Sequence, residues 1–169
     1  YAFNNCTSLE RVIFENNYCQ IDNSSFSNCT SLVKITANNQ ILMLFYQIGH
    51  NFYKGIGVTI NKQEACRYFK LAADNECLEA MYIYGNMLYN GNGVQINKAE
   101  SNRYYKIAAD SGYTDAILAY GINLQYGNGV QVNKTESTRY FKNGAENGNK
   151  DSMFYYGYNL DKGNGVRKI

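Results

Sequence analysis

The first residues that could do chemistry are a pair of glycines, Gly91 and Gly93, in the stretch YNGNGVQINKAE (89–100). Glycines at this spacing ahead of a helix occur in phosphate-binding loops, where backbone amides surround the anion. A dinucleotide site needs a third glycine, in the pattern G-x-G-x-x-G after a strand, and a P-loop ends in G-K-[ST]. Neither pattern is present, so we interpret the pair as a turn between two helices that binds no nucleotide.

Cysteine and histidine side chains are the other candidates for chemistry. The sequence contains a single histidine, His50, and no C-x-x-C pair, so it predicts no metal site. Cys66 and His50 could form a nucleophile–base pair, but no third residue that would orient the base can be named. An odd number of cysteines argues against a disulfide framework, and we expect reduced, structural thiols at Cys6, Cys19, Cys29, Cys66 and Cys77. The sequence therefore predicts no catalytic residue, no metal and no cofactor.

The composition limits the kinds of partner. The 169 residues include 18% charged side chains and carry a net charge of +2, which is too balanced to indicate nucleic acid or a membrane surface. The longest apolar run, ILMLFY (41–46), is far shorter than the ~18–20 residues of a membrane span. We expect a protein or peptide partner, no nucleic acid, no membrane span in this sequence and no small-molecule substrate. The sequence lacks an initiator Met and a signal-peptide pattern, so we interpret it as a fragment; its compartment is left open, with an intracellular location slightly favoured over the cell surface.

The glycine pair recurs at a fixed period. The second glycine of each pair stands 36 residues after the previous one, at Gly57, Gly93, Gly129 and Gly165. A valine follows each pair, and three copies continue with Asn-Lys and an R-Y-[FY]-K segment, as in EACRYFKLAAD (64–74). Self-similarity at a period of this length indicates a solenoid.

Each copy predicts two helices. In the first, Ala80, Tyr84, Gly85 and Leu88 fall on one apolar face of a 3.6-residue period. A glycine inside a helix costs about 1 kcal/mol relative to alanine, so its recurrence predicts a close helix crossing without room for a Cβ. The second helix is expected to begin at an Asn N-cap three residues before a Glu, a capping-box pattern, and to end at a glycine such as Gly112.

The pattern A-x3-Y-G-x2-L-x2-G-x-G-V, followed by the RYYKIAAD segment, resembles the Sel-1-like repeat, a relative of the tetratricopeptide repeat. The resemblance implies a mainly α fold, a right-handed α-solenoid of helix-loop-helix units that acts as an adaptor for other proteins. It covers 41–169, with copies at about 41–76, 77–112 and 113–148 and a partial copy at 149–169. Leu44, Glu76 and Gly144 depart from the pattern, and we expect these changes to affect only local packing.

A different repeat precedes the solenoid. AFNNCTSLERVIF (2–14) returns 23 residues later as SFSNCTSLVKITA (25–37), with the L-x-x-L-x-L spacing of a leucine-rich strand. This segment resembles the BspA-like class of leucine-rich repeats, known from bacterial and protist surface proteins. We therefore predict that 1–38 is the C-terminal part of such a domain and contributes a short β segment, with Cys6 and Cys29 at its inward corners.

Basic side chains recur on the second helices, for example at Arg103 and Lys106. Glu100 lies three residues before that arginine, and Asp110 lies four residues after that lysine. Such pairs stabilise a helix by about 0.2–0.5 kcal/mol each. They predict a mixed, solvated face rather than a basic stripe for an acidic partner.

The surface predicted to bind a partner is the concave one. In tetratricopeptide-type solenoids, side chains of the first helices that are not used in packing line this face. By that register the predicted protein-binding residues are Tyr46, His50, Tyr53, Tyr82, Asn86, Tyr89, Leu118, Ile122, Gln125, Phe154, Tyr158 and Asp161. Aromatic side chains that carry a polar group are typical of binding hot spots. The alternative, that these tyrosines only pack against the neighbouring repeat, stays open.

The sequence thus favours a non-enzymatic interaction scaffold that presents a concave, aromatic-rich groove to a protein or peptide. The alternative is a cell-surface adhesin, in which the leucine-rich repeats bind host or matrix protein and the solenoid is a stalk. An enzyme would need a polar catalytic cluster that the sequence does not offer. Because Gly163 and Gly165 should introduce a second helix that the sequence lacks, we also predict an exposed C-terminal edge.

Overall fold

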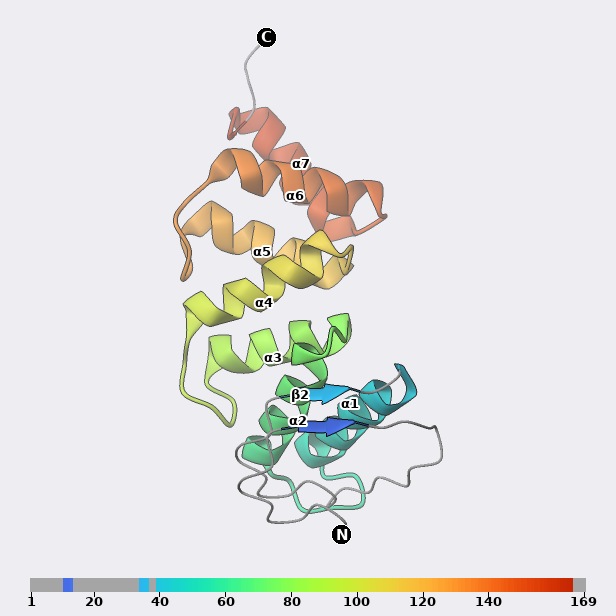
Figure 1. The fold of residues 1–169 in the computed structure, drawn as a ribbon. Helices are drawn as coiled ribbons and strands as arrows, with labels where there is room; N and C mark the ends of the chain where they lie inside the picture. The colour runs from blue at the N-terminus through green and yellow to red at the C-terminus, as the bar shows by residue number, and fades with distance from the viewer. Residues whose placement is uncertain (1–10, 14–33, 37–38, 166–169) are drawn as a thin grey trace.

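The helices stack in chain order into a column. The computed structural model describes residues 11–13, 34–36 and 39–165, and its helices follow one another from α1 near the N-terminus to α7 at the far end (Figure 1). Within these described residues the helices are α1 (Asn39–Lys54), α2 (Lys62–Asp74), α3 (Leu78–Asn90), α4 (Lys98–Asp110), α5 (Thr114–Tyr126), α6 (Lys134–Glu146) and α7 (Lys150–Lys162). Each helix packs against the next one along the chain, which confirms the predicted solenoid of helix-loop-helix units. No helix in the described ranges is long and apolar enough to cross a bilayer.

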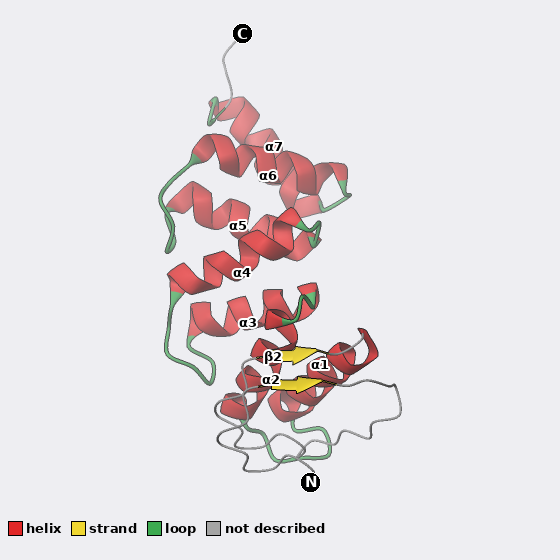
Figure 2. Ribbon diagram, viewed as in Figure 1, coloured by secondary structure: helices red, strands yellow, loops and turns green. Residues whose placement is uncertain are grey.

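Two short strands precede the helices (Figure 2). They are β1 (Arg11–Ile13) and β2 (Lys34–Thr36), and they pair in parallel. Val12 lies opposite Ile35, so the pairing register equals the 23-residue offset of the sequence repeat. This register agrees with the predicted β segment. The cysteines predicted at its inward corners, Cys6 and Cys29, lie outside the described residues, as does Cys19.

The second helix of each pair begins at the predicted asparagine N-cap. The Asn97 side chain accepts a hydrogen bond from the backbone N–H of Glu100 at 3.0 Å. In a capping box the glutamate would bond back to the N-cap N–H, but that N–H donates instead to the carbonyl of Leu88 at 2.9 Å, at the end of the first helix. Glu100 accepts from the Asn97 side-chain amide at 3.1 Å. The N-cap is therefore confirmed, and it also ties the second helix to the first.

The glycine inside each first helix marks a close helix crossing, as predicted. A Cβ placed on Gly85 would lie 2.6 Å from the ring of Tyr105, and one on Gly121 would lie 2.7 Å from the ring of Phe141. Both rings belong to the second helix of the same pair. At Gly157, in α7, a Cβ would meet no described atom within 4 Å. The glycine is thus a packing requirement in the α3–α4 and α5–α6 pairs, and in the α1–α2 pair a Cβ on Gly49 would lie 3.1 Å from the ring of Phe69.

One departure from the repeat pattern is compensated by another. Gly144 in α6 replaces the alanine found at Ala108, and Ser152 in α7 replaces the alanine found at Ala116. A Cβ on Gly144 would lie 2.7 Å from the Cβ of Ser152 and closer still to the Ser152 hydroxyl oxygen. The smaller residue on one helix therefore makes room for the larger one on its neighbour, and the local packing is preserved.

Buried polar side chains join neighbouring repeats. Asn123 in α5 donates to the side-chain oxygen of Asn102 in α4 at 2.8 Å, and both residues are buried. One repeat later, Asn159 in α7 donates to the hydroxyl of Thr138 in α6 at 2.9 Å. Because each bond crosses from the second helix of one repeat to the first helix of the next, these pairs fix how successive repeats stack.

The second helices are also linked directly along one edge of the column. The Tyr104 hydroxyl donates to the carboxylate of Asp74, and the Tyr140 hydroxyl donates to that of Asp110. Each bond spans 30 residues of sequence. One edge of the column is therefore held together by a repeated tyrosine–aspartate hydrogen bond.

Candidate functional site

Both glycines of the loop at Gly91 and Gly93 have a structural role in the turn and in the contact between repeats. Gly91 and Gly93 both adopt positive φ, at 74° and 76°. The N–H groups of Gly91 and Asn92 both donate to the carbonyl of Met87, which closes α3. A Cβ on Gly93 would lie 2.1 Å from the backbone oxygen of Lys62, at the start of the preceding repeat's second helix. The two glycines therefore serve chain reversal and close contact between repeats, in agreement with the predicted turn between two helices.

Cys66 and His50 do not make an activated pair. Cys66 is 6% exposed, and burial raises the pKa of its thiol to about 12, so the reactive thiolate is suppressed at neutral pH. His50 lies on α1 with its ring stacked on Tyr46, the centroids 6.5 Å apart. Cys77 is half-buried, and burial also raises its thiol pKa. Within the described ranges, no three His, Cys, Asp or Glu side chains come together as a metal site would require.

A first hollow lies where α1 and α3 face each other. It encloses about 270 Å³ and is lined by Tyr46, His50, Tyr53, Lys54, Phe69, Ile83, Asn86, Met87 and Asn92. Tyr46 is oriented by a hydrogen bond from its hydroxyl to Glu79 at 2.9 Å and by an edge contact with Phe69. Its pKa is raised to about 12, first by burial and then by the bond to Glu79. The hollow thus combines aromatic walls with amide and imidazole groups.

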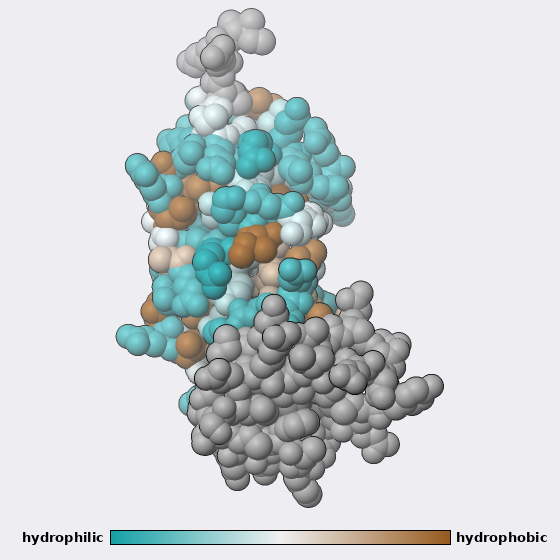
Figure 3. Space-filling view, viewed as in Figure 1, coloured by the Kyte–Doolittle hydropathy of each residue, from teal (hydrophilic) through white to brown (hydrophobic). Residues whose placement is uncertain are grey.

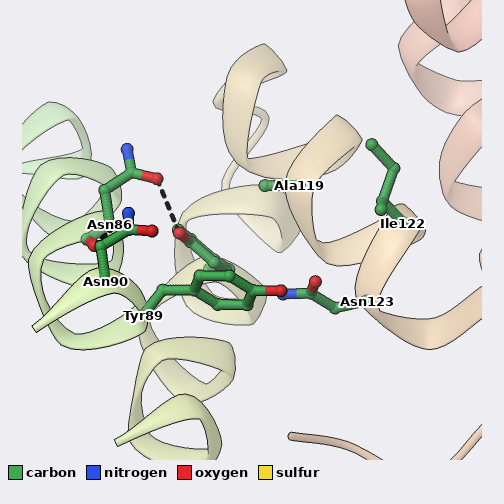
Figure 4. A pocket seen from close by; sticks show the side chains of 7 residues that line it. Asn86, Tyr89, Asn90, Ala119, Ile122 and Asn123 are labelled. Carbon is green, nitrogen blue, oxygen red and sulfur yellow. Dashed lines mark hydrogen bonds between the residues drawn. The ribbon is translucent and has the colours of Figure 1, made fainter. Parts of the chain in front are cut away.

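A second hollow lies between α3 and α5. It encloses about 250 Å³ and is lined by Asn86, Tyr89, Asn90, Tyr105, Ala119, Ile122 and Asn123. Figure 4 shows Asn86, Tyr89 and Asn90 on one side, facing Ala119, Ile122 and Asn123 on the other. The Tyr105 hydroxyl donates to the side-chain oxygen of Asn86 at 2.7 Å. Because Asn86 lines both hollows, they adjoin along the face formed by the first helices. We call this surface the first-helix groove.

Six of the residues predicted for the concave face therefore line the first-helix groove: Tyr46, His50, Tyr53, Asn86, Tyr89 and Ile122. Tyr82 does not, because its half-buried ring packs against Tyr105 and Tyr113 with centroids 5.9 and 5.6 Å away. For this tyrosine the packing alternative applies. Leu118 is half-buried and lines neither hollow.

The prediction that Gln125 faces a partner is wrong. Gln125 is 6% exposed, and its side-chain oxygen accepts a hydrogen bond from the Asn159 amide at 3.0 Å. It turns inward because Asn159, buried in the next first helix, needs a polar acceptor. The α7 members of the predicted set, Phe154, Tyr158 and Asp161, are exposed but line neither hollow.

The sequence prediction missed Asn90 and Asn92, which line the groove beside the predicted residues. Asn90 follows Asn86 by one helical turn and donates to its backbone carbonyl at 2.9 Å. The spacing of four residues places both amides on one face of α3, and this was the available signal. Asn92 belongs to the glycine loop, and only the stacking of repeats brings it to the groove.

The second helices carry paired charges. Arg103 lies 4.0 Å from Glu100, and Lys106 donates a hydrogen bond to Asp110. The Arg103 guanidinium also lies over the ring of Tyr104 at 4.4 Å. On the side of the described surface that Figure 3 shows, hydrophilic side chains predominate and apolar ones form small separate patches. The prediction of a mixed, solvated face is confirmed.

Two family models match the chain. The Sel1 repeat model matches residues 78–113, 114–149 and 150–168, which is more than half of the sequence. The model for the BspA type Leucine rich repeat region (6 copies) matches residues 1–65 and so extends over α1 and the start of α2. No curated protein is significantly similar to this chain.

Solved structures share the arrangement of helices. The crystal structure of a Sel1 repeat protein from Oxalobacter formigenes is 28% identical, with a TM-score of 0.73 over 75% of this chain and 52% of that one. A protective antigen of uropathogenic Escherichia coli strains, displaying an SLR fold, is 23% identical with a TM-score of 0.73 over 76% of this chain and 27% of that one. Helicobacter pylori cysteine rich protein B is 19% identical, with a TM-score of 0.58 over 69% and 90% of the two chains. The chain thus spans about half or less of the first two structures, and the last two likenesses concern the fold alone.

Proposed function

The chain belongs to the Sel1 repeat family, and from that premise we propose that it is a non-enzymatic scaffold that binds a protein or peptide in its first-helix groove. Sel1-type repeats typically mediate protein interactions, and solenoids of this kind use extended concave surfaces for binding. The main support for this proposal is that the two hollows adjoin at Asn86, which lines both of them. Together they form one continuous groove along the first helices.

The chemistry of the groove supports a peptide rather than a small molecule as the ligand. Tyrosine rings at Tyr53 and Tyr89 offer apolar faces with polar ends, as binding hot spots do. The amides of Asn86 and Asn90 lie one helical turn apart, and each can both donate and accept hydrogen bonds, as recognition of a peptide backbone requires. Both hollows are open and small, of about 250 and 270 Å³, which is below the usual volume of an enclosed small-molecule site, roughly 300–1,000 Å³.

The non-enzymatic part of the proposal rests on the titratable groups. Among the described residues, the most strongly shifted pKa values belong to buried tyrosines and to Cys66, whose neutral forms burial favours. These groups are spread along the packed core of the column. A catalytic site would instead bring an acid, a base or a nucleophile with opposed shifts into one pocket.

A second candidate function, a surface adhesin, rests on the leucine-rich repeat match at residues 1–65. In that case the N-terminal repeats would bind the partner and the helical repeats would form a stalk. We place the boundary between the two parts at 38–40, because α1 begins at Asn39 and packs on α2 as the first helix of a repeat. The first helical repeat would then be 41–76, followed by 77–112, 113–148 and the partial copy 149–169.

The test is a selection of displayed random peptides on the whole chain, followed by affinity measurements on variants. In the groove variant, His50→Ala and Tyr89→Ala are combined. In the control variant, the exposed apolar residues Ile107 and Tyr126, which line neither hollow, are both changed to alanine. We expect the selected peptides to bind the groove variant at least tenfold more weakly, a loss of about 1.4 kcal/mol, and the control variant with unchanged affinity.

Circular dichroism must show that both variants retain the helical signal of the parent chain, so that a loss of affinity cannot be due to unfolding. Peptides that bind the groove variant as tightly as the parent chain would refute the groove assignment. If those same peptides lost affinity when residues 1–38 were substituted, the adhesin function would take its place.

A further inference from the structure

The first-helix groove presents positive charge to a ligand and no negative charge. Among the described residues that line its two hollows, Lys54 is basic and none is an Asp or a Glu. A second ammonium group, that of Lys98, lies 4.7 Å from the ring centroid of Tyr89, which lines the second hollow. Interfaces pair surfaces of opposite potential, so the groove favours a ligand that carries a carboxylate.

Lys54 has no ion-pair partner among the described residues. Its ammonium group lies 5.6 Å from the ring centroid of Tyr53. By contrast, lysines such as Lys106 on the second helices pair with a carboxylate on their own helix. Glu79 is bonded to the Tyr46 hydroxyl, and Tyr46 precedes Lys54 by roughly 12 Å along the helix axis. Because the Debye length at physiological salt is about 8 Å, the charge of Glu79 leaves that of Lys54 available.

The two amides of the groove are already oriented, and their orientation suits a peptide backbone. The Tyr105 hydroxyl donates to the side-chain oxygen of Asn86 at 2.7 Å, so in the described structure the Asn86 NH2 group is available to donate. The Asn90 NH2 group donates to the Asn86 backbone carbonyl at 2.9 Å, so the Asn90 oxygen is available to accept. Both side chains lie on the same side of the second hollow (Figure 4). They offer one donor and one acceptor to the C=O and N–H groups of an extended chain.

The character of the groove changes in one direction along the column. At one position of the 36-residue repeat, the lining residue is His50 in α1, Asn86 in α3 and Ile122 in α5. Lys54 adds to the polar end one helical turn after His50, and Ala119 adds to the apolar end one turn before Ile122. The groove is therefore basic at α1, amide-lined at α3 and apolar at α5, and a matching ligand has a defined direction.

Resting on the proposed function, we propose that the ligand is an extended acidic peptide bound in this single orientation. Its Asp or Glu side chain meets the Lys54 ammonium and the His50 imidazole, which has an N–H to donate in either protonation state. Its backbone bonds to the amides at α3, and an aliphatic side chain further along the peptide lies against Ala119 and Ile122. The groove thus selects a peptide by charge at one end and by apolar contact at the other.

The depth of the first hollow assigns the carboxylate to a side chain rather than to the end of the peptide. The deepest lining residues are apolar, with Phe69 1% and Met87 2% exposed. Lys54 is exposed and lies at the rim. A chain end entering the hollow would bring its carboxylate to the apolar floor, whereas an Asp or Glu side chain keeps its charge at the surface beside Lys54.

The test uses random displayed peptides selected on the whole chain. We expect the selected peptides to share an Asp or Glu and an aliphatic residue in a fixed order. They should bind the Lys54→Glu variant at least tenfold more weakly than the parent chain. A peptide in which the acidic residue is replaced by lysine should then recover affinity for that variant, because the charges of the pair are exchanged.

Lys162→Glu is the matched control. Lys162 occupies the same repeat position in α7 as Lys54 does in α1, near the end of its helix, but it lines neither hollow. The substitution makes the same change in net charge and should leave the affinity unchanged. Circular dichroism must show that both variants keep the helical signal of the parent chain. Lys54→Gln provides a second variant, which removes the charge without reversing it and should give a smaller loss of affinity.

The outcomes separate this inference from the proposed function. Peptides that lose affinity in the combined His50→Ala, Tyr89→Ala variant but bind Lys54→Glu as tightly as the parent chain would overturn the acidic ligand and leave the scaffold function in place. The carboxylate would belong to the chain end if C-terminal amidation of a peptide weakened binding while replacement of its Glu by Gln did not. A selection that yields only peptides insensitive to the groove variant would overturn both proposals.

Discussion

At the scale of single residues, the helix glycines show how strictly the fold constrains one position. The Cβ of alanine at position 121 would lie 2.7 Å from the Phe141 ring, and overpacking of this kind costs about 1–3 kcal/mol. We expect Gly121→Ala to lower the free energy of unfolding by that amount. Gly157→Ala should instead raise it by about 1 kcal/mol, through helix propensity alone. Urea denaturation of both variants measures this difference, and equal effects at the two positions would contradict the packing described for α5 and α6.

Glu76 is the only described residue other than glycine with positive φ, at 71°. It stands where the later repeats have Gly112 and Gly148, and a side chain in this conformation costs about 1–2 kcal/mol. Glu76→Gly should therefore stabilise the chain by about 1 kcal/mol, seen as a higher thermal midpoint. Glu76→Ala serves as the matched control, because it removes the charge but keeps the Cβ. A gain with alanine as large as that with glycine would point to charge rather than backbone strain.

At the scale of helices, the junction between α4 and α5 depends on a buried amide pair. Asn123→Ala would leave the buried oxygen of Asn102 without its donor, and such a loss costs about 1–3 kcal/mol. At the preceding junction, between α2 and α3, the two equivalent positions hold Cys66 and Met87, both buried. The double variant Asn102→Cys, Asn123→Met should therefore recover most of the stability lost in the single variant. Denaturant midpoints of the single and double variants test this, and a double variant weaker than Asn123→Ala would show that the amides cannot be exchanged for apolar groups.

The sequence pattern was sufficient for the helices and their ends, because each depends on residues close together in the chain. The Asn97 cap, the Gly91 turn and the Gly121 crossing all follow from local spacing and recur with the repeat. The inward turn of Gln125 could not be predicted in this way, since its partner Asn159 lies 34 residues away. Whether Tyr82 faces a partner or only packs could not be decided from the sequence for the same reason, because the rings that it contacts are Tyr105 in α4 and Tyr113 at the N-cap of α5.

At the scale of the whole molecule, the column is built on tyrosines that must stay neutral. Burial raises the pKa of Tyr105 and Tyr113 to about 12, and it raises those of Tyr84, Tyr104 and Tyr140 further. In the unfolded chain these phenols ionise at their ordinary value of about 10. A raised folded pKa contributes stability that is complete below pH 10 and is lost as the pH rises towards the folded values.

We therefore expect a cooperative alkaline unfolding that begins above about pH 10. Helical circular dichroism and the ultraviolet absorbance of tyrosinate, measured across pH 8–12.5, should change together for the buried tyrosines. Ionisation of all tyrosines near pH 10 with an unchanged helical signal would contradict the role of their neutral form.

Asp110 makes the stability of the fold depend on pH in the opposite direction, at low pH. Burial alone would raise its pKa, but the hydrogen bonds from Lys106 and Tyr140 hold it below the usual value. Its contribution is present above the unfolded pKa and is lost as the pH falls through the folded one. The hydrogen bond from Tyr140 to Asp110 is thus lost at either extreme of pH. At high pH the Tyr140 hydroxyl ionises, and at low pH the Asp110 carboxylate is protonated.

The tyrosine–aspartate bonds have a mechanical consequence. They pin the second helices at Tyr104 and Tyr140, while the hollows open between the first helices. A column fastened along one edge and loosely filled along the other bends most easily about the fastened edge. A small change in the curvature of the column would then change the distances between α1, α3 and α5. The bending stiffness of the column would therefore set the width of the first-helix groove that a bound peptide can use.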